Sequence, residues 1–206
     1  MSDSSIPASK QTPPANPWLH FVERCEACTA CSLNQERKQA VVWRGSVKAN
    51  LMIIGEGPGE REDEEGLPFV GRSGELLDTL LAAQELGPES YHIANVVKCR
   101  PPNNREPSLE EARACRPLLN EQFRFVRPQV ILLMGGSAYK YFTGDLDTGI
   151  TKVRGRWIQK GSYWIMPTFH PAYILRDSRN KAALWEDMTK VRDKLEELRL
   201  IPPVKG

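Results

Sequence analysis

Four short apolar runs, separated by helical patterns, constrain the fold of this 206-residue chain more than any other feature. Each run has the length and the apolar character of a strand that is buried on both faces. The runs cover residues 49–55, 91–97, 128–134 and 164–169. Helical patterns cover residues 18–25, 73–86, 108–125, 137–142 and 182–200. This alternation predicts an α/β fold in which a mainly parallel sheet is covered by helices on both sides.

Local signals place the ends of two of these helices. Ser108 and Glu111 have the spacing of a capping box, which predicts that a helix begins there and runs through Phe125. Pro117 lies inside that helix and predicts a break or a kink, because proline lacks the backbone N–H. Ser73 is the expected cap of the helix that follows it.

The length and composition predict one folded domain with short appendages. We expect the domain to span residues 18–201, a disordered leader to span residues 1–17, and a tail to span residues 202–206. No apolar run reaches the roughly 18 residues that a membrane span requires. The leader has no secretory signal pattern, so we expect a cytoplasmic protein.

Five cysteines fall into two distant parts of the chain. Cys25, Cys28 and Cys31 lie near the N-terminus, whereas Cys99 and Cys115 lie in the middle. Cytosolic thiols usually stay reduced, which favours a metal site over disulfides. Four cysteines can bind either zinc or a [4Fe–4S] cluster. Since only one pair is compact, the spacing favours a cluster slightly, leaves zinc open, and leaves one thiol over in either case.

Residues that could bind a ligand or take part in catalysis follow three of the expected strands. Parallel sheets bind ligands at these strand ends. The glycines of residues 55–59 allow a ligand to approach backbone N–H groups, although an ordinary turn would also contain them. Asn95 could read the edge of a pyrimidine, or it could be a satisfied buried amide. His170 could donate a hydrogen bond to an oxygen that gains charge, although most single histidines do no chemistry. We expect structural roles for His20 and His92.

Charge and aromatic content allow nucleic acid as a ligand without requiring it. The net charge is +2, and carboxylates gather at residues 56–65 while arginines gather in other segments. A DNA-binding protein could place these arginines on one face, and a solvated surface would also hold them. Phe69 could stack on a planar base, an interaction worth ~1–3 kcal/mol per base, although a lone aromatic is more often part of the core.

Taken together, five ordered blocks resemble the family 4 uracil-DNA glycosylases, the iron–sulfur members of the uracil-DNA glycosylase superfamily. The resemblance covers most of the chain, from about Cys28 to Trp185. The blocks are Gly55–Gly59 with Glu62 and Asp63, Gly66–Gly71, Asn95–Pro102, Arg154–Trp157 and His170–Arg176.

The resemblance implies a three-layer α/β/α fold with a central four-stranded parallel sheet. It also implies a [4Fe–4S] cluster held by the residues matching Cys28, Cys31, Cys99 and Cys115. Cys25 matches no family ligand and is expected to be a bystander. Ligation by Cys25 together with Cys28 remains the alternative.

The resemblance further implies a uracil site. The residues matching those that hold uracil in the family are Gly55, Glu56, Gly57, Phe69, Asn95 and His170. The chain departs from the commonest pattern at Gly57, where many members have alanine, and at Ala172, where serine is usual. The Arg-Arg-Ile-His loop of a related, covalently bonding branch is missing, so we expect no cross-linking to the excised site.

The implied activity is that of a monofunctional DNA glycosylase that initiates base excision repair. It would hydrolyse the N-glycosidic bond of deoxyuridine, release uracil and leave an abasic site. His170 and Glu56 are the expected catalytic residues, and Arg100, Arg105 and Arg176 are expected to contact phosphates of single- or double-stranded DNA. We expect a monomer. The alternative is a non-enzymatic iron–sulfur DNA-binding or polymerase-associated protein of the same fold.

Overall fold

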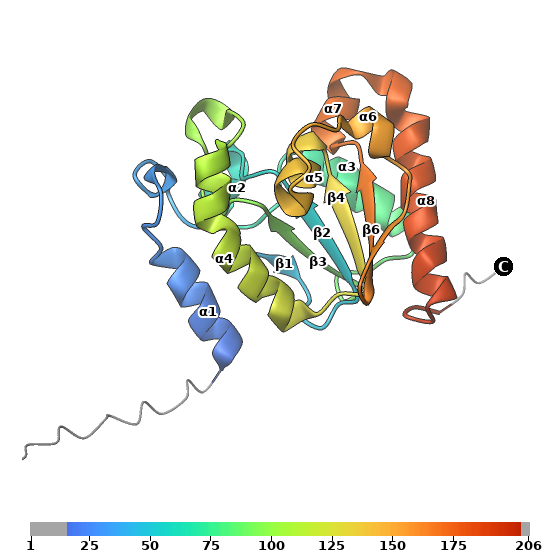
Figure 1. The fold of residues 1–206 in the computed structure, drawn as a ribbon, viewed down its shortest axis with the longest axis horizontal. Coiled ribbons are helices and arrows are strands. Elements are labelled where there is room, and N and C mark those ends of the chain that lie inside the picture. The colour runs from blue at the N-terminus through green and yellow to red at the C-terminus, as the bar shows by residue number, and fades with distance from the viewer. Residues whose placement is uncertain (1–15, 203–206) are drawn as a thin grey trace, which may run out of the picture.

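The computed structural model describes residues 16–202 (Figure 1). The expected leader and tail lie almost entirely outside the described residues. Within this part of the chain, no helix is long and apolar enough to cross a membrane.

A six-stranded sheet in the order β1-β3-β2-β4-β6-β5 forms the centre of the fold. Its four middle strands are parallel: β3 (Tyr91–Asn95), β2 (Leu51–Gly55), β4 (Val130–Met134) and β6 (Tyr163–Thr168). These strands confirm the expected parallel sheet. Two short antiparallel strands, β1 (Arg44–Gly45) and β5 (Ile158–Lys160), extend its edges and were not expected from the sequence.

Helices cover both faces of the sheet, as the alternating pattern predicts (Figure 1). The longer helices are α1 (Pro17–Glu26), α3 (Arg72–Ala83), α4 (Leu109–Val126), α5 (Gly136–Thr143) and α8 (Lys181–Glu197). Short helices are α2 (Glu60–Glu65), α6 (Ile150–Val153), α7 (Pro171–Arg176), η1 (Ser32–Asn34), η2 (Pro102–Asn104) and η3 (Ser178–Asn180).

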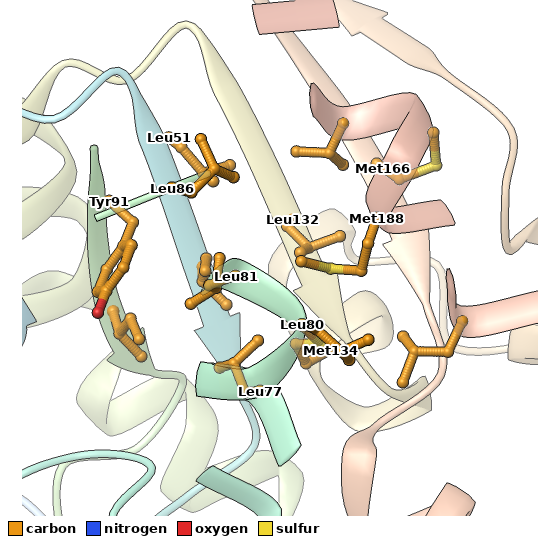
Figure 2. Packing of buried hydrophobic residues seen from close by; sticks show 14 of the residues in the cluster. Leu51, Leu77, Leu80, Leu81, Leu86, Tyr91, Leu132, Met134, Met166 and Met188 are labelled. Atoms are coloured by element: carbon orange, nitrogen blue, oxygen red, sulfur yellow. The ribbon is translucent and has the colours of Figure 1, made fainter. Parts of the chain in front are cut away.

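The two faces of each strand belong to different cores because successive side chains point to opposite sides. Leu51 and Ile53 of β2 pack with α3 and α8 on one face, where Figure 2 shows Leu77, Leu81 and Met188 gathered against the strands. Residues 52 and 54 of the same strand pack with α4 and α5 on the other face. Helix α1 packs outside this layer against α4.

The expected helix signals have different outcomes. The capping box is confirmed, since Ser108 Oγ accepts the Glu111 N–H at 3.1 Å and Glu111 Oε2 accepts the Ser108 N–H at 2.7 Å. The expected break at Pro117 is wrong, because α4 continues through it. Cys115 and Leu119, on either side of Pro117, are buried in the core between α4 and the sheet. The expected cap at Ser73 is also wrong, because α3 begins one residue earlier with Gly71 as its cap.

Candidate active site

A cavity of about 410 Å³ lies where β2, β3 and β6 end. Strand register explains part of this grouping, because Gly55 pairs with Asn95 in the parallel β2–β3 ladder. Predicted site residues that line the cavity are Glu56, Gly57, Phe69, Asn95, His170 and Arg176. The structure therefore brings together residues that are more than a hundred positions apart in the sequence.

Gly55 lies behind the cavity wall and is required by close packing. A Cβ atom at this position would lie 2.4 Å from Asn95 Oδ1 and 2.7 Å from Phe69 Cε2. Both distances are far below van der Waals contact, and the neighbouring atoms are the two side chains proposed to hold a base. The absence of a side chain at Gly55 thus lets Phe69 and Asn95 occupy their places.

Phe69 is held in an unusual backbone conformation. Its φ of +56° lies in the left-handed region, which costs about 1–3 kcal/mol for a non-glycine residue and is common at functional sites. The Phe69 ring lies nearly parallel to the His170 ring, with centroids 5.5 Å apart. Helix α3 packs directly on this backbone, since a Cβ at Gly74 would lie 1.8 Å from the Phe69 carbonyl oxygen.

Asn95 presents an unused amide at the cavity. The residue is only 2% exposed, and within residues 16–202 its side-chain amide has no hydrogen-bond partner. Its amide atoms are not among the fully enclosed side-chain atoms that lack a partner, so they face the open space of the cavity. A ligand in the cavity could supply the missing partners.

His170 caps helix α7, and this contact decides which of its nitrogens carries the proton. Its Nδ1 accepts the Ala172 N–H at 3.1 Å, so we assign the proton of the neutral ring to Nε2. Burial, together with the charge of Arg176, lowers the pKa of His170 to about 4. The ring is therefore neutral at pH 7, with Nε2–H available as a donor.

Glu56 follows β2 and shares its surroundings with a second carboxyl group. Burial and the nearby Glu106 raise the pKa of Glu56, whereas a hydrogen bond with Ser137 opposes the rise. Ser137 donates its single hydroxyl proton to Glu106 Oε1 at 2.7 Å. Glu56 can accept a proton or orient a polar group at the cavity wall.

The three arginines expected to contact phosphates differ in their surroundings. Arg176 lines the cavity, whereas Arg100 and Arg105 do not. Arg105 makes a two-point contact with Glu111, at 2.8 and 2.7 Å, and Arg100 donates to Asn104 Oδ1 at 2.8 Å. The structure thus places only Arg176 beside the other predicted residues.

Several polar residues of the cavity wall received no site role from the sequence, namely Glu62, Ser73, Asn104 and Tyr173. Glu62 is the most informative, because its carboxylate accepts the N–H groups of Gly59 at 3.1 Å and Gly71 at 3.3 Å. It therefore ties the glycine-rich loop to the loop that carries Phe69. Its position at the third residue of α2 was a readable signal, since a glutamate there often bonds back to the cap residue.

All five cysteines line a second, small cavity between α1, α4 and the residues after β3. None forms a disulfide. Arg37 Nη1 donates to Cys99 Sγ at 2.9 Å. Burial raises the pKa of Cys115 to about 11, which keeps its free thiol protonated until a bound cation reverses the balance.

The family model of the uracil DNA glycosylase superfamily matches residues 42–189, which include the whole parallel sheet. The chain belongs to this superfamily.

Similar proteins place the chain within its type-4 family. The type-4 uracil-DNA glycosylase of Thermotoga maritima is 43% identical over 175 residues, covering 82% of this chain and 90% of that protein. The type-4 enzyme of Sulfurisphaera tokodaii is 43% identical over 180 residues, covering 83% and 81%. That of Saccharolobus solfataricus is 41% identical over 183 residues, covering 85% of both chains. The resemblance read from the five sequence blocks is confirmed.

The two departures from the common type-4 pattern have local structural settings. A Cβ at Gly57 would lie 2.8 Å from Val97 Cγ2, so the glycine matches the bulk of the side chain beside it. Ala172 lines the cavity and supplies the N–H that orients His170, a contact that needs no side chain. Neither departure removes a polar group on which the proposed base contacts depend.

Proposed function

We propose that this member of the type-4 family excises uracil from DNA. It hydrolyses the N-glycosidic bond of deoxyuridine, releases uracil and leaves an abasic site. The observation that carries this function is the meeting of an unpaired Asn95 amide, the Phe69 ring and a neutral His170 in one cavity.

Recognition begins with a base turned out of the stack, at a cost of a few kcal/mol. The Phe69 ring stacks on the flipped base, and the Asn95 amide pairs with its Watson–Crick edge. Uracil presents an acceptor and an N–H donor there, and cytosine presents a donor in place of the first acceptor. The amide, with one acceptor and two donors, can thereby favour uracil.

Bond cleavage requires stabilisation of the negative charge that builds on uracil O2. His170 donates to this oxygen from Nε2, and N–H groups of the glycine-rich loop assist it. Because the ring is neutral before the reaction, it stabilises the charge as a preorganised hydrogen-bond donor. Glu56 orients the attacking water or offsets the positive charge of the sugar.

The non-enzymatic alternative is not favoured. A protein that only binds DNA has no need of a base-sized cavity in which an aromatic ring, an unpaired amide and an oriented histidine meet. The relatives named above also carry names that state the glycosylase activity.

The cysteines offer the four thiolates that an iron–sulfur cluster takes. Cys28, Cys31, Cys99 and Cys115 line one cavity, and none of them forms a disulfide. We infer that these four residues hold a [4Fe–4S] cluster, which supplies structural support when bound. Cys25, whose pKa burial raises to about 12, stays a protonated neighbour.

We further propose the setting in which the enzyme works. The folded unit is a single domain over residues 18–201, acting as a monomer in the cytoplasm on single- and double-stranded DNA. Arg176 contacts the phosphates beside the flipped nucleotide, and Arg100 and Arg105 contact phosphates farther away.

Uracil release from a labelled oligonucleotide, detected by alkaline scission at the abasic site, tests this function. His170→Ala should lower the single-turnover rate by about 10²–10³-fold, the usual effect of removing one donor to a developing anion. Asn95→Ala should cause a comparable loss, with unfolding midpoints close to the wild-type value. His20→Ala is the matched control, because this exposed histidine lies on α1. Wild-type rates in His170→Ala and Asn95→Ala would contradict the assignment.

A further inference from the structure

Lys98 is a fully buried lysine without a carboxylate partner in the described part of the chain. Its side chain is 1% exposed. Nζ donates to the Asn95 carbonyl oxygen at 2.8 Å and to Gln122 Oε1 at 2.6 Å, and both acceptors are neutral. Burying an ammonium group is costly unless opposite charge lies nearby. An anionic group is therefore expected near Lys98, and no carboxylate of the described residues takes that place.

The cysteine cavity lies directly against this lysine. Lys98 lines the cavity together with the cysteines. Cys99 and Cys115, two of the proposed cluster ligands, line the same cavity as Lys98. Thiolates that hold a metal centre would supply the missing opposite charge.

The hydrogen-bond directions around Lys98 follow from its having only donors. Gln122 must accept at Oε1, so its Nε2 donates to the Val42 carbonyl oxygen at 3.0 Å and to His92 Nε2 at 2.9 Å. His92 then carries its proton on Nδ1, which donates to the Ser46 carbonyl oxygen at 3.1 Å. One cation thus orders a buried network that reaches the chain segment beside β1.

The Lys98 ammonium also holds the main chain of Asn95, the residue proposed to recognise uracil. Asn95 ends β3, and its carbonyl oxygen lies three residues before Lys98, at the point where the chain leaves the sheet. This contact fixes the backbone from which the Asn95 amide projects into the active-site cavity. Lys98 accordingly lines the cysteine cavity, and its ammonium donates to the carbonyl oxygen of Asn95, a residue that lines the active-site cavity.

We propose that Lys98 is a positioning residue that couples the cysteine centre to Asn95. The thiolates of the centre offset its charge, and its ammonium holds the Asn95 carbonyl in place for base recognition. This inference rests on the proposed function, since it requires Asn95 to bind uracil and the cysteines to hold a cluster. It gives the centre an influence on uracil excision without a direct contact with the base.

Lys98→Met tests the coupling in the full-length holoprotein, because it keeps the length of the side chain and removes both the charge and the donors. We expect kcat/KM for a uracil oligonucleotide to fall by about 10- to 100-fold, the usual effect of losing a hydrogen bond from a charged group. The midpoint potential of the centre should become more negative, because an added electron loses a neighbouring positive charge. Iron content and visible absorption measure occupancy of the centre independently of activity.

Three further variants keep the test decisive. Lys98→Arg retains the charge and should restore the potential together with part of the activity. Lys98→Gln removes only the charge and a part of the length, and it replaces Lys98→Met should that variant fail to fold. Lys194→Met is the matched control, since this mostly buried lysine lies over Trp164, away from both cavities, and its loss should change neither readout.

The outcomes separate the coupling from the function on which it rests. A Lys98→Met or Lys98→Gln protein with wild-type kcat/KM and wild-type potential would overturn the coupling, even if its melting temperature fell. Wild-type protein that excises uracil without iron would refute the cluster, and with it the coupling. Wild-type protein that binds iron but leaves uracil in place would refute the glycosylase function, and the potential alone would then show whether Lys98 acts on the centre.

Discussion

Gly55→Ala adds a single methyl group, and we expect it to slow uracil release strongly. The new methyl carbon would lie 2.4 Å from Asn95 Oδ1 and 2.7 and 2.8 Å from two atoms of the Phe69 ring. The φ of Gly55 does not lie in the left-handed region, so the backbone tolerates alanine. The whole effect must therefore come from displacement of Asn95 and Phe69.

The required displacement sets the magnitude. Ordinary van der Waals contact begins at 3.4 Å, so Asn95 Oδ1 must move by 3.4 minus 2.4, which is 1.0 Å. A misplacement of about 1 Å can cost a factor of about 100 in rate. That factor corresponds to about 2.7 kcal/mol of lost transition-state stabilisation. Overpacking of this kind also lowers the free energy of unfolding by about 1–3 kcal/mol.

Single-turnover uracil release from single-stranded DNA measures this effect without a contribution from duplex opening. Gly57→Ala is the matched control, because its Cβ would meet one close atom, Val97 Cγ2 at 2.8 Å, and its next neighbours lie 3.7 Å away. Val97 needs to move by 3.4 minus 2.8, or 0.6 Å, and it is not proposed to contact the base. We expect a loss below about tenfold for this variant.

The reasoning fails if Gly55→Ala releases uracil within about threefold of the wild-type rate while Asn95→Ala is strongly impaired. That result would mean that Asn95 keeps its productive position despite the added methyl group. A crystal structure of the variant would then show which other atoms had moved. Equal losses in Gly55→Ala and Gly57→Ala would instead show that the loop as a whole, and not the contact with Asn95, controls the rate.

Three further predictions concern two buried neutral histidines, one buried ion pair and the arginine at the cavity. Acid should destabilise the protein, because burial lowers the pKa values of His92 to about 3 and His170 to about 4 from an ordinary 6.5. The unfolded chain then binds protons first, so urea midpoints should fall as the pH drops from 6.5 toward 4, and a constant midpoint would contradict this. Asp187→Asn should cost about 3 kcal/mol in urea unfolding, since it breaks a buried pair with Arg154; a cost below about 1 kcal/mol would refute the role of the pair. Arg176→Ala should reduce the slope of log affinity against log salt by about 1 for a uracil oligonucleotide, and an unchanged slope would show that Arg176 contacts no phosphate.

The parallel strands were predictable because each is a local run of apolar residues. The edge strands were not predictable in this way, since β1 has two residues and β5 has three, and both depend on pairing with a distant strand. The break predicted at Pro117 does not occur, because proline removes one hydrogen bond locally whereas packing on both sides holds α4 together.

The candidate site shows the same division between local and distant information. Glycine, asparagine and histidine at strand ends are visible in the sequence because each follows a local apolar run, and residue counting gives the spacing of the cysteines. The tertiary structure decided which groups are left unpaired: Asn95 keeps a free amide, whereas Arg105 is paired with Glu111. It also set the proton position of His170 and placed Lys98 in the wall of the cysteine cavity, with its ammonium on the Asn95 carbonyl oxygen. The physical reason is that hydrogen bonding and burial depend on atoms that folding brings together from distant parts of the chain.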